Sequence, residues 1–371
     1  MKFRVERDVL ADAVAWTAKS LPTRPPVPVL AGVRLDAAEQ ALTVSGFDYE
    51  VSSEVEVPID GSETGTVLVS GRLLAEITRA LPAQPVEVNA TGARVEIACG
   101  SARFTLPTMP VEDYPSLPAM PEVVGTVASD AFATAVAQVA VAAGRDDTLP
   151  MLTGIRLEIE GERIVMAATD RYRLAAREIT WRPLSPDLTE NALVPAKTLA
   201  DTAKSLTGGA EVELALSSGG AGEGMIGFAG AGKRTTTRLL DPDFPKYQSL
   251  WPKETSAVAH VETAPLVEAV KRVSLVAERN TPVRIRFAGS ELVLEAGGNE
   301  EAQAVESLDA AFEGDELTIA FNPGYLLDGL GAVGSDVTRM SFTTATKPAV
   351  LTGKDGGTEY RYLLMPIRLS A

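Results

Sequence analysis

An internal repeat constrains this chain more than any other feature of its sequence, because repeated segments predict repeated structural units. Residues 27–35 (VPVLAGVRL) recur as residues 149–157 (LPMLTGIRL), and residues 281–287 (TPVRIRF) form a weaker third copy. Each copy follows an apolar stripe with helical spacing and precedes strand-like segments. Three ordered copies of several segments predict three equivalent units in one chain.

Each unit is expected to contain two helices. The apolar stripes of the first helices are Val9, Leu10, Ala13 and Val14; Phe132, Val136, Val139 and Ala140; and Leu266, Val267, Val270, Val273 and Val276. The segments in which a strand runs into a second helix are residues 67–74, 192–199 and 319–326. Ser70 and Asn322 suit the N-cap position of these second helices, and Pro323 suits the first helical position.

Short β-rich stretches fill the rest of each unit, which predicts about eight strands in a domain of ordinary size. Proline-rich segments at residues 107–121 and 242–252 are the expected linkers. The predicted fold class is therefore α+β, with domains at residues 1–121, 122–253 and 254–371. Each domain is expected to pack two helices on antiparallel sheets.

Composition indicates a globular protein, since hydrophobic residues make up 45% and charged residues 23% of the 371 residues. The longest weakly polar run, residues 132–144, is too short to span a bilayer, so no membrane partner is expected. The start of the chain lacks the apolar core of a secretory leader. The single cysteine, Cys99, cannot form a disulfide within the chain. These features favour a cytoplasmic location.

The net charge of −16 argues by itself against binding to nucleic acid, because an acidic protein is repelled by phosphates. Binding depends on where the charge lies, however, and a ring or cleft can have a basic lining on an acidic body. The second helices carry Arg72 and Arg79 against Glu76, and Lys197 and Lys204 against Asp201.

The first helix of the third unit likewise carries Lys271 and Arg272, with Arg279 beyond them, against Glu268 and Glu278. This mild excess of positive charge fits contacts with phosphates, which carry no sequence information. Ordinary solvated helix faces would give a similar pattern.

Sites for catalysis, cofactors and metals are not expected. His260 is the only histidine, which excludes a histidine-based triad or a site with several histidine ligands within one chain. Cys99 is expected to be a buried, inert thiol. Asp170 and Asp243 could be considered as a carboxylate pair, but nothing in the sequence brings them together. We therefore expect a non-catalytic protein with no cofactor and no metal.

Two glycine-rich segments only superficially suggest nucleotide binding. Residues 227–234 (GFAGAGKR) nearly match a phosphate-binding loop, but Arg234 stands where the magnesium-binding Ser or Thr belongs. A strand-like segment follows, so a hairpin turn is expected there. Residues 219–224 are expected to form a flexible loop, because no helix follows them.

Four segments together resemble the bacterial DNA polymerase III beta sliding clamp family. They are residues 1–7 (MKFRVER), 24–30 (RPPVPVL), 169–175 (TDRYRLA) and 365–369 (MPIRL). The resemblance covers the whole chain, including the triple repeat. It implies a head-to-tail homodimer whose six domains form a ring, with helices lining the hole around duplex DNA.

The resemblance also implies a processivity factor that tethers its partners through a peptide-binding groove between domains 2 and 3. Those partners are the DNA polymerase III catalytic subunit, the clamp loader, and other polymerases and repair proteins, with a nucleoid-associated location in the cytoplasm. An apolar pocket rimmed by Arg173 and Asn322 is expected. The implied groove residues are Leu152, Thr169, Tyr172, Arg173, Leu174, Pro245, Leu250, Asn322, Tyr325, Pro348, Leu363, Leu364, Met365, Pro366, Ile367, Arg368 and Leu369.

DNA contacts and a subunit interface complete the expected sites. The expected DNA contacts are Arg24, Arg72, Arg79, Pro150, Met151, Lys197, Lys204 and Lys271. The expected interface residues are Arg103, Phe104, Leu106, Ser274 and Leu275, with Glu300, Glu301 or Glu306 as acids that Arg103 could face.

The sequence departs from the family pattern at three places. Pro150 and Met151 stand where aromatic residues often occur, Arg171 and Tyr172 replace a common Gly-His pair, and Ser249 takes a position often held by Arg. A different preference for partner motifs is therefore expected. Two rival readings are a clamp-like paralogue without a groove and a carboxylate-dependent hydrolase. The intact 365–369 segment argues against the first, and the lack of convergent acidic residues argues against the second.

Overall fold

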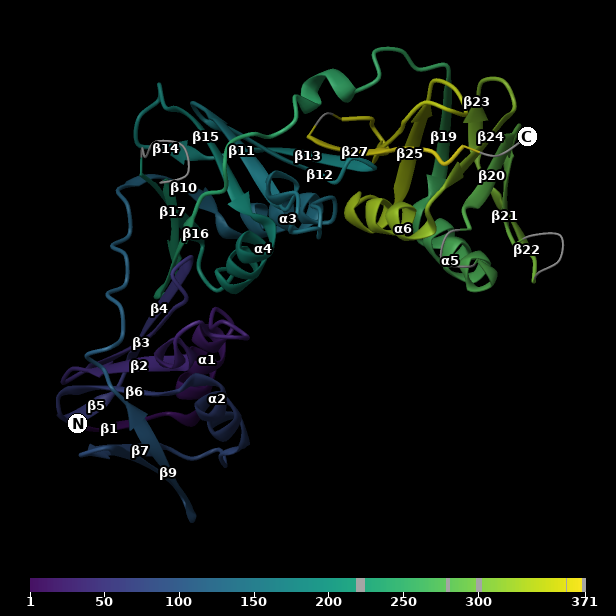
Figure 1. The fold of residues 1–371 in the computed structure, drawn as a ribbon. Helices are drawn as coiled ribbons and strands as arrows, with labels where there is room; N and C mark the ends of the chain where they lie inside the picture. Colours follow the sequence, from purple (N-terminus) through teal and green to yellow (C-terminus); the bar gives the residue numbers. More distant parts are fainter. Residues whose placement is uncertain (218–223, 278–280, 298–301, 358, 369–371) are drawn as a thin grey trace. The chain divides into compact units, whose positions relative to one another are not determined.

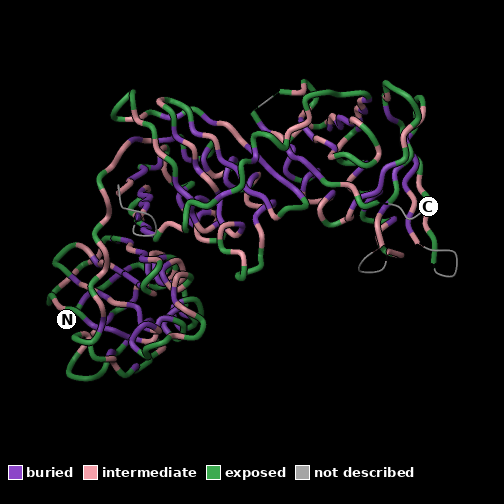
Figure 2. Tube along the Cα trace, turned by 45° about the horizontal axis from the view of Figure 1, so that its top comes forward, coloured by how far each residue is buried: buried purple, intermediate pink, exposed green. Residues whose placement is uncertain are grey.

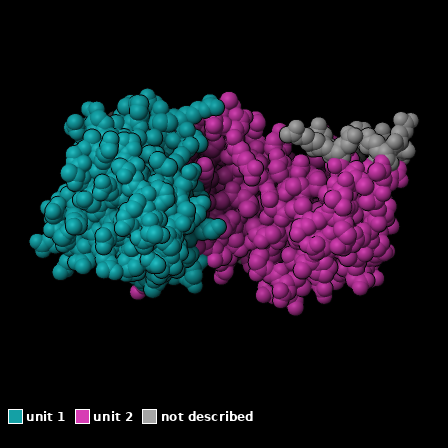
Figure 3. Space-filling view, turned by 90° about the horizontal axis from the view of Figure 1, so that it is seen from below, with its two compact units in different colours: residues 1–130, 201–239 teal, residues 131–200, 240–371 magenta. Residues whose placement is uncertain are grey.

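The computed structural model describes residues 1–217, 224–277, 281–297, 302–357 and 359–368 of the chain. The chain forms two compact units, one of residues 1–130 with 201–239 and one of residues 131–200 with 240–371 (Figure 3). Within the described residues, each third of the sequence contributes two α-helices and nine strands, one more strand than expected (Figure 1). The fold class is α+β, as predicted, while the domain boundaries stay predictions.

The regular elements follow the same order in each third of the sequence. The first third contains β1 (Lys2–Val5), α1 (Arg7–Ala18), β2 (Gly32–Ala37), β3 (Ala41–Phe47), β4 (Val51–Pro58), β5 (Asp60–Glu63), β6 (Gly65–Ser70), α2 (Gly71–Ala80), β7 (Val86–Thr91), β8 (Arg94–Cys99) and β9 (Ala102–Met109). The second contains β10 (Val123–Ala128), α3 (Ser129–Ala140), β11 (Gly154–Glu160), β12 (Arg163–Thr169), β13 (Arg173–Thr180), β14 (Arg182–Pro183), β15 (Thr189–Pro195), α4 (Ala196–Ser205), β16 (Glu211–Leu216), β17 (Met225–Gly230) and β18 (Lys233–Arg238). The third contains β19 (Ala257–Glu262), α5 (Thr263–Val273), β20 (Val283–Ala288), β21 (Glu291–Ala296), β22 (Ala304–Asp309), β23 (Ala311–Glu313), β24 (Leu317–Phe321), α6 (Pro323–Ala332), β25 (Val337–Phe342), β26 (Ala349–Gly353) and β27 (Tyr360–Leu364).

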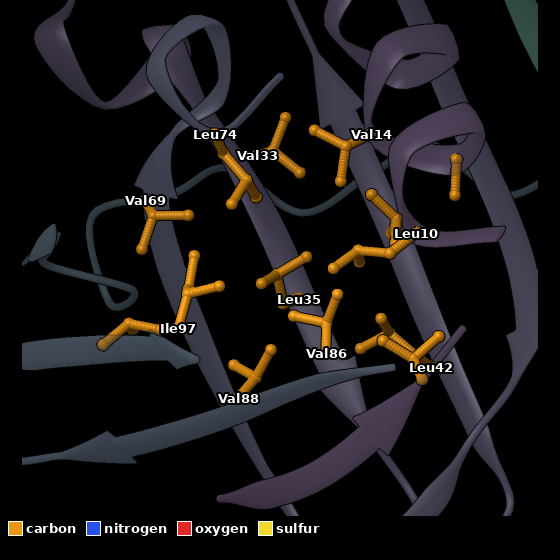
Figure 4. Packing of buried hydrophobic residues seen from close by; sticks show 14 of the residues in the cluster. Leu10, Val14, Val33, Leu35, Leu42, Val69, Leu74, Val86, Val88 and Ile97 are labelled. Carbon is orange, nitrogen blue, oxygen red and sulfur yellow. The ribbon is translucent and has the colours of Figure 1, made fainter. Parts of the chain in front are cut away.

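The apolar stripe of α1 builds the core of the first unit. Leu10, Ala13 and Val14 recur at helical spacing and are buried against the sheet. Figure 4 shows Leu10 and Val14 directed toward side chains of the strands beneath, with Leu74 of α2 in the same cluster. A fully buried leucine contributes roughly 2 kcal/mol to folding, so this face holds the helix in place. Val9, in contrast, is only half-buried.

Antiparallel strands of the first unit run in the order β10-β16-β17-β18-β4-β3-β2-β6-β9-β8-β7-β1-β5. The pairing of β4 with β18 joins the first repeat to the second. Hydroxyl side chains fill this joint, since Ser52, Ser53 and Thr235 are buried and Ser52 hydrogen-bonds to Thr236. Figure 2 shows buried residues concentrated along the strands and exposed residues along the loops.

The second unit contains a nine-stranded sheet in the order β15-β11-β12-β13-β27-β26-β25-β19-β23 and a four-stranded sheet in the order β22-β21-β20-β24. Pairing of β13 with β27, from Arg173 opposite Leu364 to Arg177 opposite Tyr360, joins the second repeat to the third (Figure 1). Unlike the hydroxyl-lined joint, this one is largely apolar, with Leu174 and Leu363 in its core. Both joints extend a sheet across a repeat boundary.

The expected linkers are packed segments. Strand β9 runs to Met109, and beyond it Tyr114 is buried against Leu30 and Phe47. In the second linker, Phe244 and Tyr247 are buried in the same cluster as Leu174 and Leu363. These aromatic side chains fix the path of each linker, which proline content alone does not reveal.

Local predictions for turns and caps had mixed outcomes. The 227–234 segment forms the expected hairpin, in which Ala231 and Gly232 connect β17 to β18 with φ values of 51° and 75°. Asn322 caps α6 by accepting a hydrogen bond from the Tyr325 amide, with Pro323 at the first turn. Ser70 occupies the predicted N-cap position of α2, but its side chain makes no cap hydrogen bond, and its backbone also ends β6 opposite Gly32.

Three apolar stripes otherwise follow the prediction, with small shifts at their ends. Ala140 and Val267 are half-buried, and Val276 lies in a short 3₁₀ helix beyond the end of α5. Residues 219–223 of the expected glycine-rich loop lie outside the described residues. No helix in the described part of the chain is long and apolar enough to cross a membrane.

Candidate functional site

A tight turn between β12 and β13 organises the predicted groove in the second unit. The carboxylate oxygen Oδ1 of Asp170 accepts hydrogen bonds from the backbone amides of Tyr172 and Arg173, at 3.0 and 3.1 Å. This Asx-type turn places Arg171 in the left-handed region, with a φ of 80°. The turn leaves the Tyr172 side chain 55% exposed.

Arg173 occupies a different position from the one predicted. It was expected at the rim of an apolar pocket, but its side chain is only 5% exposed. Its Nε atom lies 2.9 Å from Asp170, and its Nη1 atom donates to Asp328 of α6. Because two carboxylates enclose it, this guanidinium is a buried connection between β13 and α6, not an open rim.

The electrostatic balance around Arg173 favours its charged form. Burial lowers the pKa of the guanidinium, but its hydrogen bond to Asp328, together with Tyr362 and Asp170, raises the pKa above the ordinary value. Its Cζ atom also lies 4.3 Å from the centroid of the Tyr325 ring, a cation–π distance. The side chain is therefore held permanently charged and in one position.

Helix α6 supplies the opposite wall of the site. Asn322 caps the helix, and the Tyr325 ring stacks on Tyr172 with centroids 6.2 Å apart and planes at 24°. The hydroxyl of Tyr362 donates to the Tyr325 carbonyl at 2.8 Å, which ties α6 to β27. Gly329 permits this approach, because a Cβ there would lie 2.4 Å from the Tyr362 ring.

A cavity of about 720 Å³ opens between these elements. It brings together five predicted groove residues: Leu152, Tyr172, Arg173, Asn322 and Tyr325. The remaining lining residues are Ala143, Gly144, Arg145, Asp146, Leu149, Asp170, Arg171, Gly324 and Asp328. Six charged residues line this cavity, so the expected apolar pocket is in fact mixed in character.

A second, smaller hollow contains two further predicted groove residues. Leu250 and Pro348 line a cavity of about 310 Å³ together with Trp251, whose ring lies 4.3 Å from the Cζ atom of Arg361. Leu250 is 49% exposed, so it presents apolar surface to a ligand. Pro245 is also exposed.

The C-terminal segment runs along the same unit. The Met365 amide donates to the Tyr172 carbonyl at 2.9 Å, and the Ile367 amide donates to the Ala320 carbonyl at 2.8 Å. Met365 and Ile367 are 40% and 36% exposed. Pro366 is half-buried and Arg368 is exposed, while Leu369 lies outside the described residues.

Four of the predicted groove residues are buried and expose almost no side-chain surface to a ligand. They lie beneath the turn and the C-terminal segment and are Thr169, Leu174, Leu363 and Leu364. The Thr169 hydroxyl donates to the Arg173 carbonyl at 2.7 Å, which further fixes the turn. These residues support the site from below.

Predicted DNA contacts are mostly exposed. The exposed ones are Arg24, Arg72, Arg79, Pro150, Lys197, Lys204 and Lys271. Met151 instead packs partly against the Leu174 cluster, which limits any contact it could make. The Lys271 ammonium forms an ion pair with Glu268 at 2.8 Å, so part of its charge is neutralised within α5.

Predicted interface residues divide into surface and core positions. Phe104 is 37% and Leu275 is 84% exposed, whereas Leu106 is 2% exposed inside the core of the first unit. The prediction that Leu106 offers interface surface was therefore wrong, because its side chain fills the space beside Val95. Ser274 is half-buried, and its hydroxyl donates to the Val270 carbonyl.

Charge at the predicted interface is largely satisfied within the chain. Arg103 donates to the carbonyls of Gly100 and Ala102, and Glu306 pairs with Arg272 at 2.6 Å. Glu300 and Glu301, the other expected partners of Arg103, lie outside the described residues. Val305, 67% exposed on β22, is a surface residue that the sequence analysis missed.

The single cysteine and the single histidine both lie in the β-rich framework of the protein. Cys99 is buried with its Sγ atom 3.3 Å from the carbonyls of Pro82 and Gln84, as expected of a structural thiol. His260 lies in β19 opposite Arg339 and Ala311. Within the described ranges, no cluster of His, Cys, Asp and Glu has the arrangement of a metal site.

Comparison with known proteins gives matches along the whole chain. The family models for the DNA polymerase III beta subunit match in order: the N-terminal domain over residues 1–118, the central domain over 126–246 and the C-terminal domain over 248–368. The chain is 62% identical over 375 residues to the beta sliding clamp of Streptomyces coelicolor, covering 100% of both. It is 46% identical to the beta sliding clamp homolog GriR of Streptomyces muensis, covering 99% of both.

Solved structures give the same result. The DNA polymerase sliding clamp of Bacillus subtilis aligns over 100% of both chains with a TM-score of 0.91 and 26% identity. A sliding clamp of Pseudomonas aeruginosa bound to griselimycin aligns equally completely, also with a TM-score of 0.91 and 26% identity.

Proposed function

The chain belongs to the DNA polymerase III beta subunit family, the beta sliding clamps, and we propose that two copies close head to tail into a ring around duplex DNA. The family is non-catalytic: its members are processivity subunits of DNA replication. The observation that carries the proposal is the match of three successive domain models to a chain whose described residues form two helices and nine strands in each third of the sequence. Repeats of one fold, joined head to tail, allow two chains to form a closed ring with one kind of interface.

Two incompletely paired strands support the proposed head-to-tail contact. On β9, residues 102–107 pair with β8, while β6 pairs only with Thr108 and Met109. Among the described residues, β22 pairs with β21 and with no other strand. The unpaired backbone groups of such edges can hydrogen-bond to a strand of another chain. Each edge also carries an exposed apolar residue, Phe104 on β9 and Val305 on β22. We therefore assign β9 of one copy and β22 of the next to the interface, with Leu275 beside them.

Exposed basic residues on the helices would contact the DNA backbone. Arg72 and Arg79 of α2, and Lys197 and Lys204 of α4, have no ion pair within the part of the chain that the structure describes. Contacts of this kind touch phosphates and do not distinguish base sequences. Encirclement makes tight binding unnecessary, which reconciles a DNA-binding role with a net charge of −16.

The proposed groove lies in the second unit, around the Tyr172–Tyr325 stack and the Leu250–Pro348 hollow. Exposed apolar side chains beside mixed polar walls suit a short peptide with a few anchoring residues. The proposed partners are the polymerase III catalytic subunit, the clamp loader, and other polymerases and repair proteins, at the nucleoid in the cytoplasm. The related Pseudomonas clamp holds griselimycin, which supports ligand binding in this family.

Retention on DNA tests the ring directly. The chain, loaded by its clamp loader onto a nicked circular plasmid, should stay bound through gel filtration at high salt and leave when the plasmid is linearised. An ordinary DNA-binding protein would leave both forms equally as salt rises. Equal release from circular and linear DNA would contradict the proposal.

A further inference from the structure

An unfavourable backbone conformation at Arg171 singles out one side of the large cavity. Arg171 has a φ of 80°, in the left-handed region where Gly, Asn and Asp are favoured and a long side chain is not. Its side chain is exposed and lines the cavity. Strained residues of this type tend to occur where a side chain is needed for function.

The acidic side chains of the cavity have hydrogen-bond partners, whereas two of its basic side chains have none among the described residues. All three carboxylates of its wall already accept hydrogen bonds: Asp146 from Thr148, and Asp170 and Asp328 from Arg173. The guanidinium groups of Arg145 and Arg171, in contrast, make no hydrogen bond or ion pair within the described residues. A guanidinium group without a partner can bind a carboxylate through two parallel N–H donors.

The two arginines lie beside the apolar part of the same cavity. Leu149 and Leu152 line it together with the stacked rings of Tyr172 and Tyr325. The pKa of Asp146 is lowered by its hydrogen bonds from Thr148 and, to a smaller extent, by the Arg171 charge. Arg145, Asp146 and Arg171 all line this one cavity, so the two arginines border the same space.

We propose that Arg145 and Arg171 together bind the carboxylate of an Asp or Glu next to the apolar anchors of a partner peptide. The pair thereby makes acidic flanking residues a determinant of partner choice. This inference rests on the proposed groove function. A peptide is favoured over a nucleic acid because the donors share one cavity with the exposed Tyr172 ring and several predicted groove residues.

The test uses the full-length clamp and the clamp-binding peptide of the organism's own polymerase III catalytic subunit. The peptide is made in a neutral form, with every Asp and Glu changed to Asn and Gln, and as a series with one Asp restored at each position. Fluorescence anisotropy should show one position at which Asp binds about five- to tenfold more tightly than Asn, the gain expected of a charge-assisted contact. This gain should shrink as salt rises.

Substitutions at Arg171 separate binding from folding. Arg171→Gly relieves the left-handed backbone, so its melting temperature should stay the same or rise while the preference for the acidic peptide is lost. Arg171→Lys should keep part of the preference, Arg145→Gln should reduce it, and Lys354→Gln, an exposed site outside the cavity, should leave it unchanged.

The outcomes distinguish the two levels of the proposal. If no form of the peptide binds the wild-type chain, the groove function itself fails. If neutral and acidic forms bind equally, or Arg171→Gly keeps the full preference, the groove stands and the role of the arginines is overturned. Binding of the same variants to oligo(dT) is measured in parallel. If Arg171→Gly and Arg145→Gln lose oligo(dT) binding but keep the peptide preference, the proposal is overturned and the two arginines are assigned to single-stranded DNA instead.

Discussion

Arg173 on β13 and Asp328 on α6 form an ion pair that spans 155 residues of sequence and connects a strand to a helix of the second unit. The same guanidinium holds Asp170, so the turn that presents Tyr172 and the helix that presents Tyr325 share one charged connection. The stacked rings of Tyr172 and Tyr325 are therefore positioned by a group that is itself almost inaccessible.

Replacing Arg173 should affect folding as well as binding. Arg173→Ala leaves two carboxylates without their cation. We expect the free energy of unfolding to fall by about 2 kcal/mol, less than for a fully buried ion pair, because Asp328 is partly exposed to solvent. Urea denaturation followed by circular dichroism measures this change. Asp328→Asn is the matched control and should cost less, because one carboxylate remains. A fully stable Arg173→Ala variant that has lost only peptide affinity would restore the rim position first predicted.

Substitutions on β9 should separate the core from the interface. Leu106→Ala removes a buried side chain and should lower the unfolding free energy by about 3 kcal/mol. Phe104→Ala, two residues away, should leave the melting temperature nearly unchanged and weaken dimerisation in sedimentation equilibrium. The interface assignment is contradicted if Phe104→Ala and Leu275→Ala sediment like the wild-type chain at every concentration.

Basic residues on the helices should contribute unequally to DNA contact. Lys197→Gln removes a charge without an ion pair, while Lys271→Gln removes one already paired with Glu268. We expect Lys197→Gln to reduce clamp loading onto primed DNA several-fold more at low salt than Lys271→Gln does. The difference should fade at high salt, and neither variant should change the dependence on DNA sequence. Equal losses of clamp loading for the two variants would show that the ion pair with Glu268 does not reduce the contribution of Lys271 to DNA contact.

Stability should fall at alkaline pH. Burial raises the pKa of Tyr114 from 10.0 to about 12, so the folded state keeps this phenol protonated at pH values where the unfolded chain has lost the proton. The stabilising effect is complete below pH 10 and is lost progressively as pH rises toward 12. Denaturant melts at several pH values should show this decline, with a shallower slope for Tyr114→Phe. An unchanged slope in that variant would assign the decline to other groups.

The sequence predicts the repeated architecture well, because helical stripes and strand-to-helix segments are local signals that recur in order. Leu10, Ala13 and Val14 face the core for the reason that their spacing indicates. The arrangement at Arg173 could not be predicted in this way, since Asp328 is distant in sequence and acid–base pairing has no local signature. An Asp three residues before the Arg was the only available hint.

Strand edges illustrate the same limit. Alternation along β9 suggests that Phe104 and Leu106 share a face, and only the surrounding packing shows that one is exposed and the other buried. Val305 looks like an ordinary strand residue until the sheet order places β22 at an edge. Which residues of a strand remain available to a partner depends on neighbours that the sequence pattern does not specify.

The hydroxyl-lined joint between β4 and β18 gives the first repeat boundary a different mechanical character from the second. Hydroxyl groups can exchange one hydrogen-bond partner for another, or for water, when two strands slide by a small distance. The close-packed apolar joint at β13 and β27 loses contact energy under the same displacement. If the proposed ring opens to admit DNA, the β4–β18 joint of each chain is therefore expected to deform first, while the β13–β27 joint beneath the proposed groove keeps its shape.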